Sequence, residues 1–357
     1  MNYDIRKILL ILFISFSYSQ PSVAVQIGND IDGEAGCTSY CQYEPGDNSG
    51  HSVSISSDGN IVAIGAPYNY GTLGLPDGHY SGHVRVYENI DGNWVQLGSD
   101  IDGESRDNLG SSVSLSSDGT IVAIGAQQTF LNFNIDGEIV GAPGYVSVYQ
   151  YNGEDWIQLG GDIFGGAPDN LFGGSVSISS DGNIVAIGAP HDDDNSYVSI
   201  YEYNGDNWLQ LGSDVISDVS NDHAGYSVSL SSDGTIVAIG APNYWQGLNP
   251  SYVRIYEYSG SDWVQLGSDI DGEVPGDRSG HSVSLSSDGT IVAIGANGND
   301  GNGADAGHVR AYEYSGGDWV QLGSDIDGEA AVDRSGHSVS LSSDGTIVAI
   351  GANGNDG

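Results

Sequence analysis

One segment of 25 residues, DRSGHSVSLSSDGTIVAIGANGNDG, occurs twice without a change, at 277–301 and at 333–357. Looser copies precede it, and aligning them on the tripeptide Ser-Val-Ser spaces the copies 60, 63, 52, 55 and 56 residues apart. The tripeptides begin at Ser52, Ser112, Ser175, Ser227, Ser282 and Ser338. A period of this length restricts the fold to a series of supersecondary units, each of which stacks on its neighbours.

Each repeat predicts four short strands and no helix. In the copy that begins at residue 280, HSVSLS alternates polar and apolar residues, TIVAIGA is apolar throughout, and HVRAYEY and DWVQLG follow. Asp288-Gly289 predicts a type I′ hairpin turn between the first two strands. A variable loop joins the second strand to the third, and a long acidic loop leads into the next repeat. The apolar second strand requires cover on both faces, so neighbouring repeats must pack against each other.

Four antiparallel strands per repeat predict an all-β fold, a β-propeller of four-stranded blades. One tryptophan in each unit keeps the same place in the repeat, at Trp94, Trp156, Trp208, Trp263 and Trp319. A β-helix would need a shorter period, with one coil per repeat. Separate β-domains of this size would bury too little apolar surface to be stable alone. We therefore expect stacked blades.

The two ends of the repeat array are related. The segment 23–34, VAVQIGNDIDGE, matches the fourth-strand sequence WVQLGSDIDGE but has no blade before it. In a propeller, such a strand closes the ring by completing the last blade. Six repeats are visible and the last has only its first two strands, so we expect a C-terminally truncated chain whose intact form has six or seven blades. Residues 20–357 then form a single domain.

The N-terminus and the charge indicate an exported protein. Residues 1–19 have the layout of a secretory signal peptide, with Arg6 and Lys7 before an apolar run that is too short to span a bilayer. The formal net charge is −40, and Lys7 is the only lysine. A surface this acidic repels nucleic acid and anionic membranes. We expect a secreted or cell-surface protein with no nucleic-acid partner and no membrane insertion.

The chain has two cysteines, Cys37 and Cys41. In a secreted chain we expect them to form a local disulfide, and two free thiols are the alternative. The closed loop would be so short that the bond would add little stability.

Short motifs flank the strands. Phe172-Gly173 precedes one first strand, and Gly-Ala-Pro follows three second strands, at 65–67, 188–190 and 240–242. On these residues the chain resembles the FG-GAP repeats of integrin-α-type propellers, and more specifically the FG-GAP-like repeats of secreted proteins from marine Bacteroidetes-type bacteria. The resemblance covers nearly the whole mature chain. It implies a propeller of about seven blades in an extracellular or surface adhesion protein.

The sequence departs from that family at its calcium loop. The integrin-type repeat carries D-x-D-x-D-G-x-x-D between strands one and two, whereas this chain has only Ser-Ser-Asp-Gly, as at 286–289. One carboxylate in a tight turn cannot supply the roughly six to eight oxygen ligands that calcium takes. The inherited site is therefore absent. Most units also have Ser, Leu or Ala where the family has Phe before Gly.

Strand order predicts which loops share a face of the propeller. The one–two and three–four turns lie on one side, and the two–three and four–one loops lie on the other. The second side carries the variation in length and most of the acidic residues. We expect function on that side.

An acidic motif, D-I-D-G-E, recurs in the four–one loops. Carboxylates at alternate positions before a glycine turn can converge on a hard cation, so we predict a Ca²⁺ site and calcium as the candidate cofactor. The alternative is a solvated acidic turn whose isoleucine packs inward, and two units lose the motif, at 162–166 and 214–218. The candidate ligands are Asp30, Asp32, Glu34, Asp100, Asp102, Glu104, Asp269, Asp271, Glu273, Asp325, Asp327 and Glu329.

Aromatic residues outside the repeated strands lie in the two–three loops. Aromatic rings beside carboxylates and amides suit a sugar-binding surface, because they combine stacking with directed hydrogen bonds. The alternative is that the rings fold these loops onto the blade edges. The candidate ligand-binding residues are Tyr68, Tyr70, Phe130, Tyr244 and Trp245.

Histidine and arginine give weaker signals. His51, His281 and His337 share one repeat position whose other occupants differ, so the sequence assigns them no catalytic or metal role. The third-strand arginines are expected to pair with glutamates three positions further on, as Arg85 with Glu88, Arg254 with Glu257 and Arg310 with Glu313.

Together these features predict a non-enzymatic binding or adhesion module with an extracellular glycan or protein as its ligand. The sequence shows no nucleophile–base pair, zinc-ligand spacing or phosphate loop. One alternative is a polysaccharide-active hydrolase or lyase on a propeller scaffold. Another is a purely structural repeat segment of a longer surface protein.

Overall fold

The computed structural model describes residues 26–33, 47–69, 80–127, 131–133, 139–141, 143–167, 170–190, 196–243 and 251–355. These residues form strands and turns, and none of them belongs to a helix long and apolar enough to cross a membrane. The signal peptide predicted at 1–19 and the cysteines Cys37 and Cys41 lie outside the described ranges.

The described repeats form antiparallel blades of one topology, in which each strand pairs with the next along the chain. The first strands are β1 (Ser52–Ile55), β6 (Leu109–Leu115), β13 (Ser175–Ile178), β18 (Ser227–Leu230), β23 (Ser279–Leu285) and β28 (Ser335–Leu341). The second strands are β2 (Ile61–Ala66), β7 (Ile121–Ala126), β14 (Ile184–Ala189), β19 (Ile236–Ala241), β24 (Ile291–Ala296) and β29 (Val348–Ala352). The third strands are β3 (His83–Ile90), β10 (Tyr145–Tyr151), β15 (Tyr197–Tyr203), β20 (Tyr252–Tyr258) and β25 (His308–Ser315).

The fourth, outer strand of each blade is broken in two. Its first part is β4 (Asn93–Gln96), β11 (Trp156–Gln158), β16 (Trp208–Gln210), β21 (Trp263–Gln265) or β26 (Asp318–Gln321). Its second part is β5 (Ile101–Asp102), β12 (Ile163–Phe164), β17 (Val215–Ile216), β22 (Ile270–Asp271) or β27 (Ile326–Asp327). Both parts pair with the third strand of the same blade.

The second part corrects the sequence prediction, which placed the D-I-D residues in a loop. Ile101 pairs with Val84 and is only 5% exposed. Ile163 and Ile270 are equally buried. These side chains enter the core between blades, and their burial extends the sheet past the break in the outer strand.

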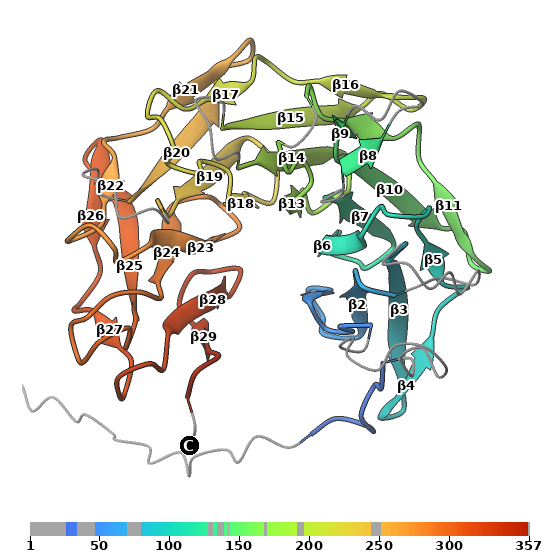
Figure 1. The fold of residues 1–357 in the computed structure, drawn as a ribbon, viewed down its shortest axis with the longest axis horizontal. Coiled ribbons are helices and arrows are strands. Elements are labelled where there is room, and N and C mark those ends of the chain that lie inside the picture. Colours follow the sequence, from blue (N-terminus) through green and yellow to red (C-terminus); the bar gives the residue numbers. More distant parts are fainter. Residues whose placement is uncertain are drawn as a thin grey trace, which may run out of the picture.

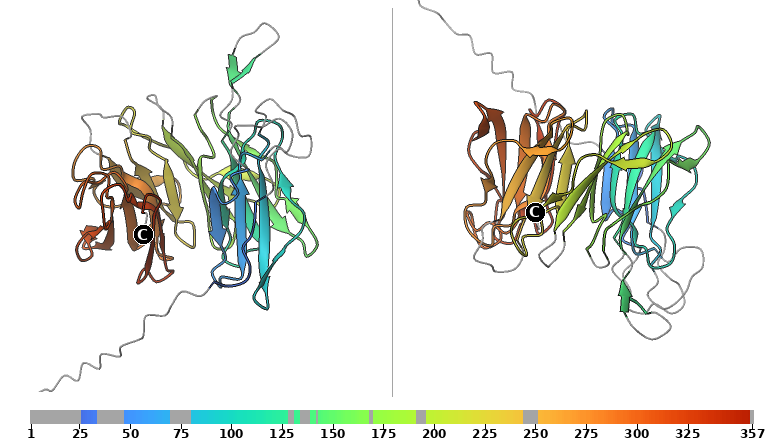
Figure 2. Two further views of the ribbon diagram at one scale, coloured as in Figure 1. Left: turned by 60° about the horizontal axis from the view of Figure 1, so that its bottom comes forward. Right: turned by 90° about the horizontal axis from the view of Figure 1, so that it is seen from above.

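The blades follow one another around a common centre, with first strands inside and fourth strands outside (Figure 1). This arrangement confirms the predicted β-propeller of four-stranded blades. The sixth described blade consists of β28 and β29. A separate hairpin, β8 (Leu131–Phe133) with β9 (Ile139–Gly141), stands off one face of the ring (Figure 2).

Apolar side chains of neighbouring blades interlock. Val84 and Val86 of the first blade pack with Val113, Leu115 and Val122 of the second. Equivalent clusters join the second blade to the third, the third to the fourth and the fourth to the fifth. Each apolar face is therefore buried by the next repeat and not by its own.

Both serines of Ser-Val-Ser join neighbouring blades. The Ser112 hydroxyl donates to the Gly173 carbonyl at 2.8 Å, and the Ser114 hydroxyl accepts from the Ile178 N–H at 3.1 Å. The same two bonds recur at the other described junctions. Because sheet hydrogen bonds within a blade cannot hold the blades together, these hydroxyls contribute polar contacts to each junction.

The glycines of the Phe-Gly and Gly-Ala motifs meet at the same junctions. A Cβ on Gly125 would lie 2.0 Å from the Gly173 carbonyl oxygen of the next blade, so no side chain fits there. Phe172, beside that glycine, is 1% exposed. The motif residues that carry the family resemblance are thus explained by close packing between blades.

The Ser-Ser-Asp-Gly turn differs from the predicted type I′ turn. Gly289 has a φ of 70°, but Asp288 does not have the positive φ that a type I′ turn requires at both central residues. The Gly289 N–H donates to the Ser286 carbonyl at 2.9 Å, and Asp288 accepts from the Ser286 hydroxyl at 2.7 Å and the Thr290 N–H at 3.0 Å. The turn also joins blades, since the Ser232 N–H donates to the Ser287 carbonyl at 2.8 Å.

The repeated tryptophans bind the outer rims of the blades. The indole N–H of Trp156 donates to the Leu97 carbonyl of the preceding blade at 2.7 Å. The indole N–H of Trp94 makes the same contact, at 2.9 Å, with the Ile27 carbonyl of the N-terminal segment. Ile27 therefore stands where a fourth-strand leucine stands at the other junctions, as the sequence match predicted. Closure of the ring by this segment stays a prediction.

Candidate functional site

The structure places the two–three and four–one loops on one face of the ring. A parallel bridge joins Gly82, at the end of a two–three loop, to Leu109, at the end of the following four–one loop. Gly307 and Ser335 form the same bridge further along the chain. Among the described residues, side chains that could meet a ligand on this face come from the D-I-D-G-E residues, the ends of the third strands and the N-terminal ends of the first strands.

The first acid of D-I-D-G-E has a structural partner in every described unit. Asp100 accepts from the Gln96 side-chain amide at 2.6 Å, across the break in the outer strand. The same contact occurs at Asp162 and Asp214, in the two units that lose the rest of the motif. It also occurs at Asp30, Asp269 and Asp325. This aspartate therefore stabilises the broken strand.

In the fourth and fifth blades the first acid also binds an arginine. Arg254 donates to Asp269 through Nε and Nη2, both at 3.0 Å, and to Asp218 at 2.6 Å. Arg310 binds Asp325 in the same forked way, at 3.0 and 2.9 Å, and its Nη2 also pairs with Glu273. Hydrogen bonds from Arg310 hold the pKa of Asp325 below its usual range.

These contacts correct the predicted arginine partners. Arg254 and Arg310 form ion pairs with acids of the D-I-D-G-E loops and of the loop at Asp218. The predicted partners, Glu257 and Glu313, lie three positions further along the same strands. Residues three apart on a strand point to opposite faces, so those pairs cannot form. Arg85 donates to the Asp32 carbonyl at 3.3 Å.

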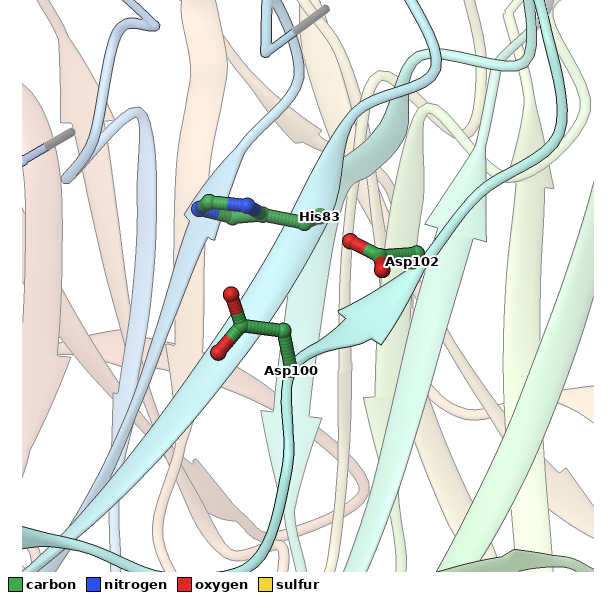
Figure 3. A group of neighbouring side chains, drawn as sticks. All are labelled: His83, Asp100 and Asp102. Atoms are coloured by element: carbon green, nitrogen blue, oxygen red, sulfur yellow. The ribbon is translucent and has the colours of Figure 1, made fainter. Parts of the chain in front are cut away.

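One D-I-D-G-E unit brings two carboxylates together with a histidine. Ligand atoms of His83, Asp100 and Asp102 all lie within 4.8 Å of one another, and both carboxylates face the His83 side chain (Figure 3). His83 begins β3 and is 1% exposed. The sequence prediction missed this histidine, although its spacing of 17 residues from Asp100 recurs between His308 and Asp325. Three ligands, one of them nitrogen, fall short of the oxygen shell that calcium takes.

A second group joins Glu273, His308 and Asp325 within the same distance. The Arg310 guanidinium binds both of its acids, so a cation already balances this group. Of the other predicted ligands, Asp271 has an exposed side chain, and the loss of some of its hydration, together with the Asp269 charge, raises its pKa. Asp32, Glu104, Asp327 and Glu329 are exposed, and Glu34 lies outside the described residues.

A cavity of about 410 Å³ lies on the same face, between the second and third blades. We call it the Phe164 pocket. Its lining residues include Phe164, Asn170, Tyr197, Tyr201, Gln210 and Asp214. Phe164 takes the place of the second acid of D-I-D-G-E and is 57% exposed. The sequence prediction missed this pocket because it treated the loss of the motif at 162–166 as the loss of a site.

A short side chain, Ser199, leaves space for the Phe164 pocket. Ser199 stands where the fourth and fifth blades have Arg254 and Arg310, whose guanidinium groups occupy the equivalent space. The Ser199 hydroxyl donates to Asp214 Oδ1 at 2.5 Å, and Gln210 donates to the same oxygen at 2.6 Å. The recorded hydrogen bonds of Asp214 therefore use one of its two carboxylate oxygens.

The Tyr197 hydroxyl is the second polar group of the Phe164 pocket. It accepts from the Gly166 N–H at 3.0 Å and from the Asn170 side-chain amide at 2.8 Å. Burial raises the pKa of Tyr197, so its hydroxyl proton stays in place at neutral pH. With both contacts accepted by the oxygen, that proton can be donated into the pocket.

The N-terminal ends of the first strands bring aromatic and imidazole rings together. Tyr226 packs on His281 at 5.2 Å between ring centroids, and His281 packs on His337 at 4.8 Å. Nε2 of His281 lies 3.2 Å from Nδ1 of His337. Burial, with smaller effects from His337 and Arg278, lowers the pKa of His281 to about 3. The sequence analysis assigned this repeat position no catalytic or metal role, but stacking of the blades places its occupants next to each other.

Only one of the predicted ligand-binding aromatics is described. Tyr68 lies 5.1 Å from Tyr80 and 6.4 Å from His51, measured between ring centroids. Tyr68 therefore packs in part on its own loop. Tyr70, Phe130, Tyr244 and Trp245 lie outside the described residues, and their predicted role stays untested.

Comparison with known proteins adds little. No protein-family model matches the chain, and no curated protein matches its sequence. Among solved structures, the chain is similar to TolB from Acinetobacter baumannii, with a TM-score of 0.44 and 13% sequence identity. The matched region covers 78% of this chain and 54% of the TolB chain, about half of its length.

Proposed function

We propose that this protein is a secreted, non-enzymatic binding module that holds a neutral carbohydrate in the Phe164 pocket. The observation that supports this most is an exposed aromatic ring beside directed polar groups. Phe164 offers a face for stacking on a sugar ring, and Asp214, Gln210 and Tyr197 offer acceptors and donors for its hydroxyls. The cavity of about 410 Å³ is within the range of small-molecule sites.

The charge of the chain favours a neutral ligand. At a net charge of −40, the protein repels anions, and the carboxylate of Asp214 would add to that repulsion inside the pocket. A neutral sugar carries no such penalty, and its hydroxyls can donate to the carboxylate. Uronic acids and sulfated glycans are therefore expected to bind worse than neutral ones.

Secretion, adhesion and membership of the FG-GAP-like, integrin-α-type repeat proteins belong to the same proposal. They rest on the signal-peptide pattern of residues 1–19, on Phe172-Gly173 and on the three Gly-Ala-Pro motifs. An extracellular place gives access to glycans of other cells or of a matrix. The protein would then act by attachment and not by chemical conversion.

Replacing the ring and the acid of the pocket tests the proposal. In a screen of neutral glycans at equal protein concentration, Phe164→Ala and Asp214→Asn are each expected to raise the dissociation constant of a bound glycan at least tenfold. That is a loss of about 1.4 kcal/mol. Ile216→Ala is the matched control, because Ile216 holds the same repeat position in the next blade and is 63% exposed. It should bind as the unaltered chain does.

Three results would contradict the proposal. If both variants keep full affinity for a glycan that the unaltered chain binds, the Phe164 pocket is not the contact. If no neutral glycan binds at millimolar concentration, the ligand class is wrong. Release of reducing ends from a bound polysaccharide would instead favour the hydrolase or lyase alternative. Glycoside hydrolysis commonly uses two carboxylates, whereas Asp214 is the one carboxylate among the described lining residues.

A further inference from the structure

His281 and His337 hold the same bulged position in the first strands of the fifth and sixth blades. The bulge turns the two rings toward each other, so that His281 Nε2 and His337 Nδ1 are 3.2 Å apart. We propose that these nitrogens, with the side-chain amide of Asn297, form a binding site for a divalent transition-metal ion of the zinc class. The inference is independent of the carbohydrate pocket.

The separation of the nitrogens fits one shared ion. Zinc binds histidine nitrogen at about 2.0–2.1 Å with tetrahedral angles, which places two ligand nitrogens about 3.3 Å apart. Without an ion, the same contact needs one ring to donate its N–H to the bare nitrogen of the other ring. An ion bound between the rings would instead be held by the lone pairs of both nitrogens, since neutral imidazole is the form that binds metals.

Beside the two histidines lies a buried amide whose oxygen has no hydrogen-bond partner in the described part of the chain. Asn297 is 3% exposed, and its Nδ2 lies 3.4 Å from Nδ1 of His337. Its Oδ1 is buried and has no hydrogen-bond partner among the described residues. A buried polar atom without a partner costs free energy, and an ion would remove that cost. Turning the amide about its last bond exchanges the two atoms and brings Oδ1 to the histidines.

The ligand set selects a borderline ion over calcium. Two imidazole nitrogens and one amide oxygen suit zinc, cobalt, nickel or copper, whereas calcium prefers oxygen alone. The positive charge of Arg278 acts on His281 and opposes any bound cation. An ion held mainly by charge would therefore be rejected, while one with strong affinity for nitrogen would bind. Water would complete the coordination shell.

Titration of the chelator-treated full chain with Zn²⁺, followed by calorimetry, tests the site. We expect saturation at one ion per chain, lost or weakened at least tenfold in His281→Ala and in His337→Ala. His51→Ala is the matched control, because His51 holds the same repeat position but the next blade has Ser111 there. It should bind zinc as the unaltered chain does. Thermal unfolding without metal establishes that each variant is folded.

Cobalt supplies a second readout. Co²⁺ bound by nitrogen and oxygen in a tetrahedral site gives intense visible absorption, which should appear in the unaltered chain and in His51→Ala but not in the other two variants. If no ion saturates a site, or if His281→Ala and His337→Ala bind zinc as tightly as the control does, the pair is an ordinary hydrogen bond. Glycan binding by these variants is expected to be unchanged, so the two proposals fail separately.

Discussion

At the scale of single residues, the repeated polar side chains are the ones that join blades. The hydroxyls of Ser112 and Ser114 bond across a junction, and so does the indole N–H of Trp156. The first acid of D-I-D-G-E, as Asp100, braces the broken outer strand. Residues that depart from the repeat, such as Phe164 and Ser199, are the ones that open a pocket.

Removing one junction hydroxyl should destabilise the fold measurably. Ser177 accepts from the Leu230 N–H of the next blade at 2.9 Å. In Ser177→Ala that N–H stays buried without a partner, which costs about 1–3 kcal/mol. The free energy of unfolding in urea should fall by this amount. Ser340→Ala is the control, because Ser340 holds the same position in the sixth blade, after which no blade is described. An equal loss in both variants would contradict the role of the junction bond.

At the scale of elements, the Ser-Ser-Asp-Gly turn is a closed structural unit. Its aspartate accepts from a serine hydroxyl, a backbone N–H and the side chain of the residue after glycine, as at Asp288. These bonds lower the pKa of Asp288, and they lower that of Asp344 to about 2. The hydrogen bonds of this carboxylate are thus made within the turn itself.

The turns predict how stability depends on pH. Because their carboxylates have lower pKa values in the folded chain than the usual value of about 3.9, the unfolded chain binds more protons in acid. Stability from the turns is complete above about pH 5 and is lost as the pH falls toward 2. The urea midpoint should decline over this window. Asp288→Asn should reduce the slope there, and an unchanged slope would show that the turn does not contribute.

At the scale of the whole molecule, each blade depends on its neighbours. Val113 and Leu115 in the second blade are 8% exposed, whereas Val53 and Ile55, their equivalents in the first blade, are 63% and 59% exposed. Ile347 in the sixth blade is 69% exposed. These faces lie at the two ends of the described arc. The predicted intact ring of six or seven blades would cover both, and it stays a prediction.

Calcium dependence is tested on the whole chain. If the D-I-D-G-E acids bind Ca²⁺, millimolar calcium should raise the thermal midpoint, a chelator should reverse the shift, and Asp269→Asn with Asp271→Asn should reduce it. The comparison must be made against sodium chloride of equal ionic strength, because any salt screens a net charge of −40. Equal shifts with both salts would make the acids a feature of solubility and structure.

The sequence by itself determined the blade. Alternation in Ser-Val-Ser, the apolar second strand and the repeat length predict an all-β propeller, because these patterns express local strand geometry and burial. It did not determine the turn type, the arginine partners or the strand character of D-I-D. Each of these depends on hydrogen bonds, or on burial, that other segments of the chain provide. Tertiary structure alone decided the candidate sites. His281 meets His337, and Phe164 and Asp214 line one pocket, only because stacking brings together residues about 50 apart in sequence.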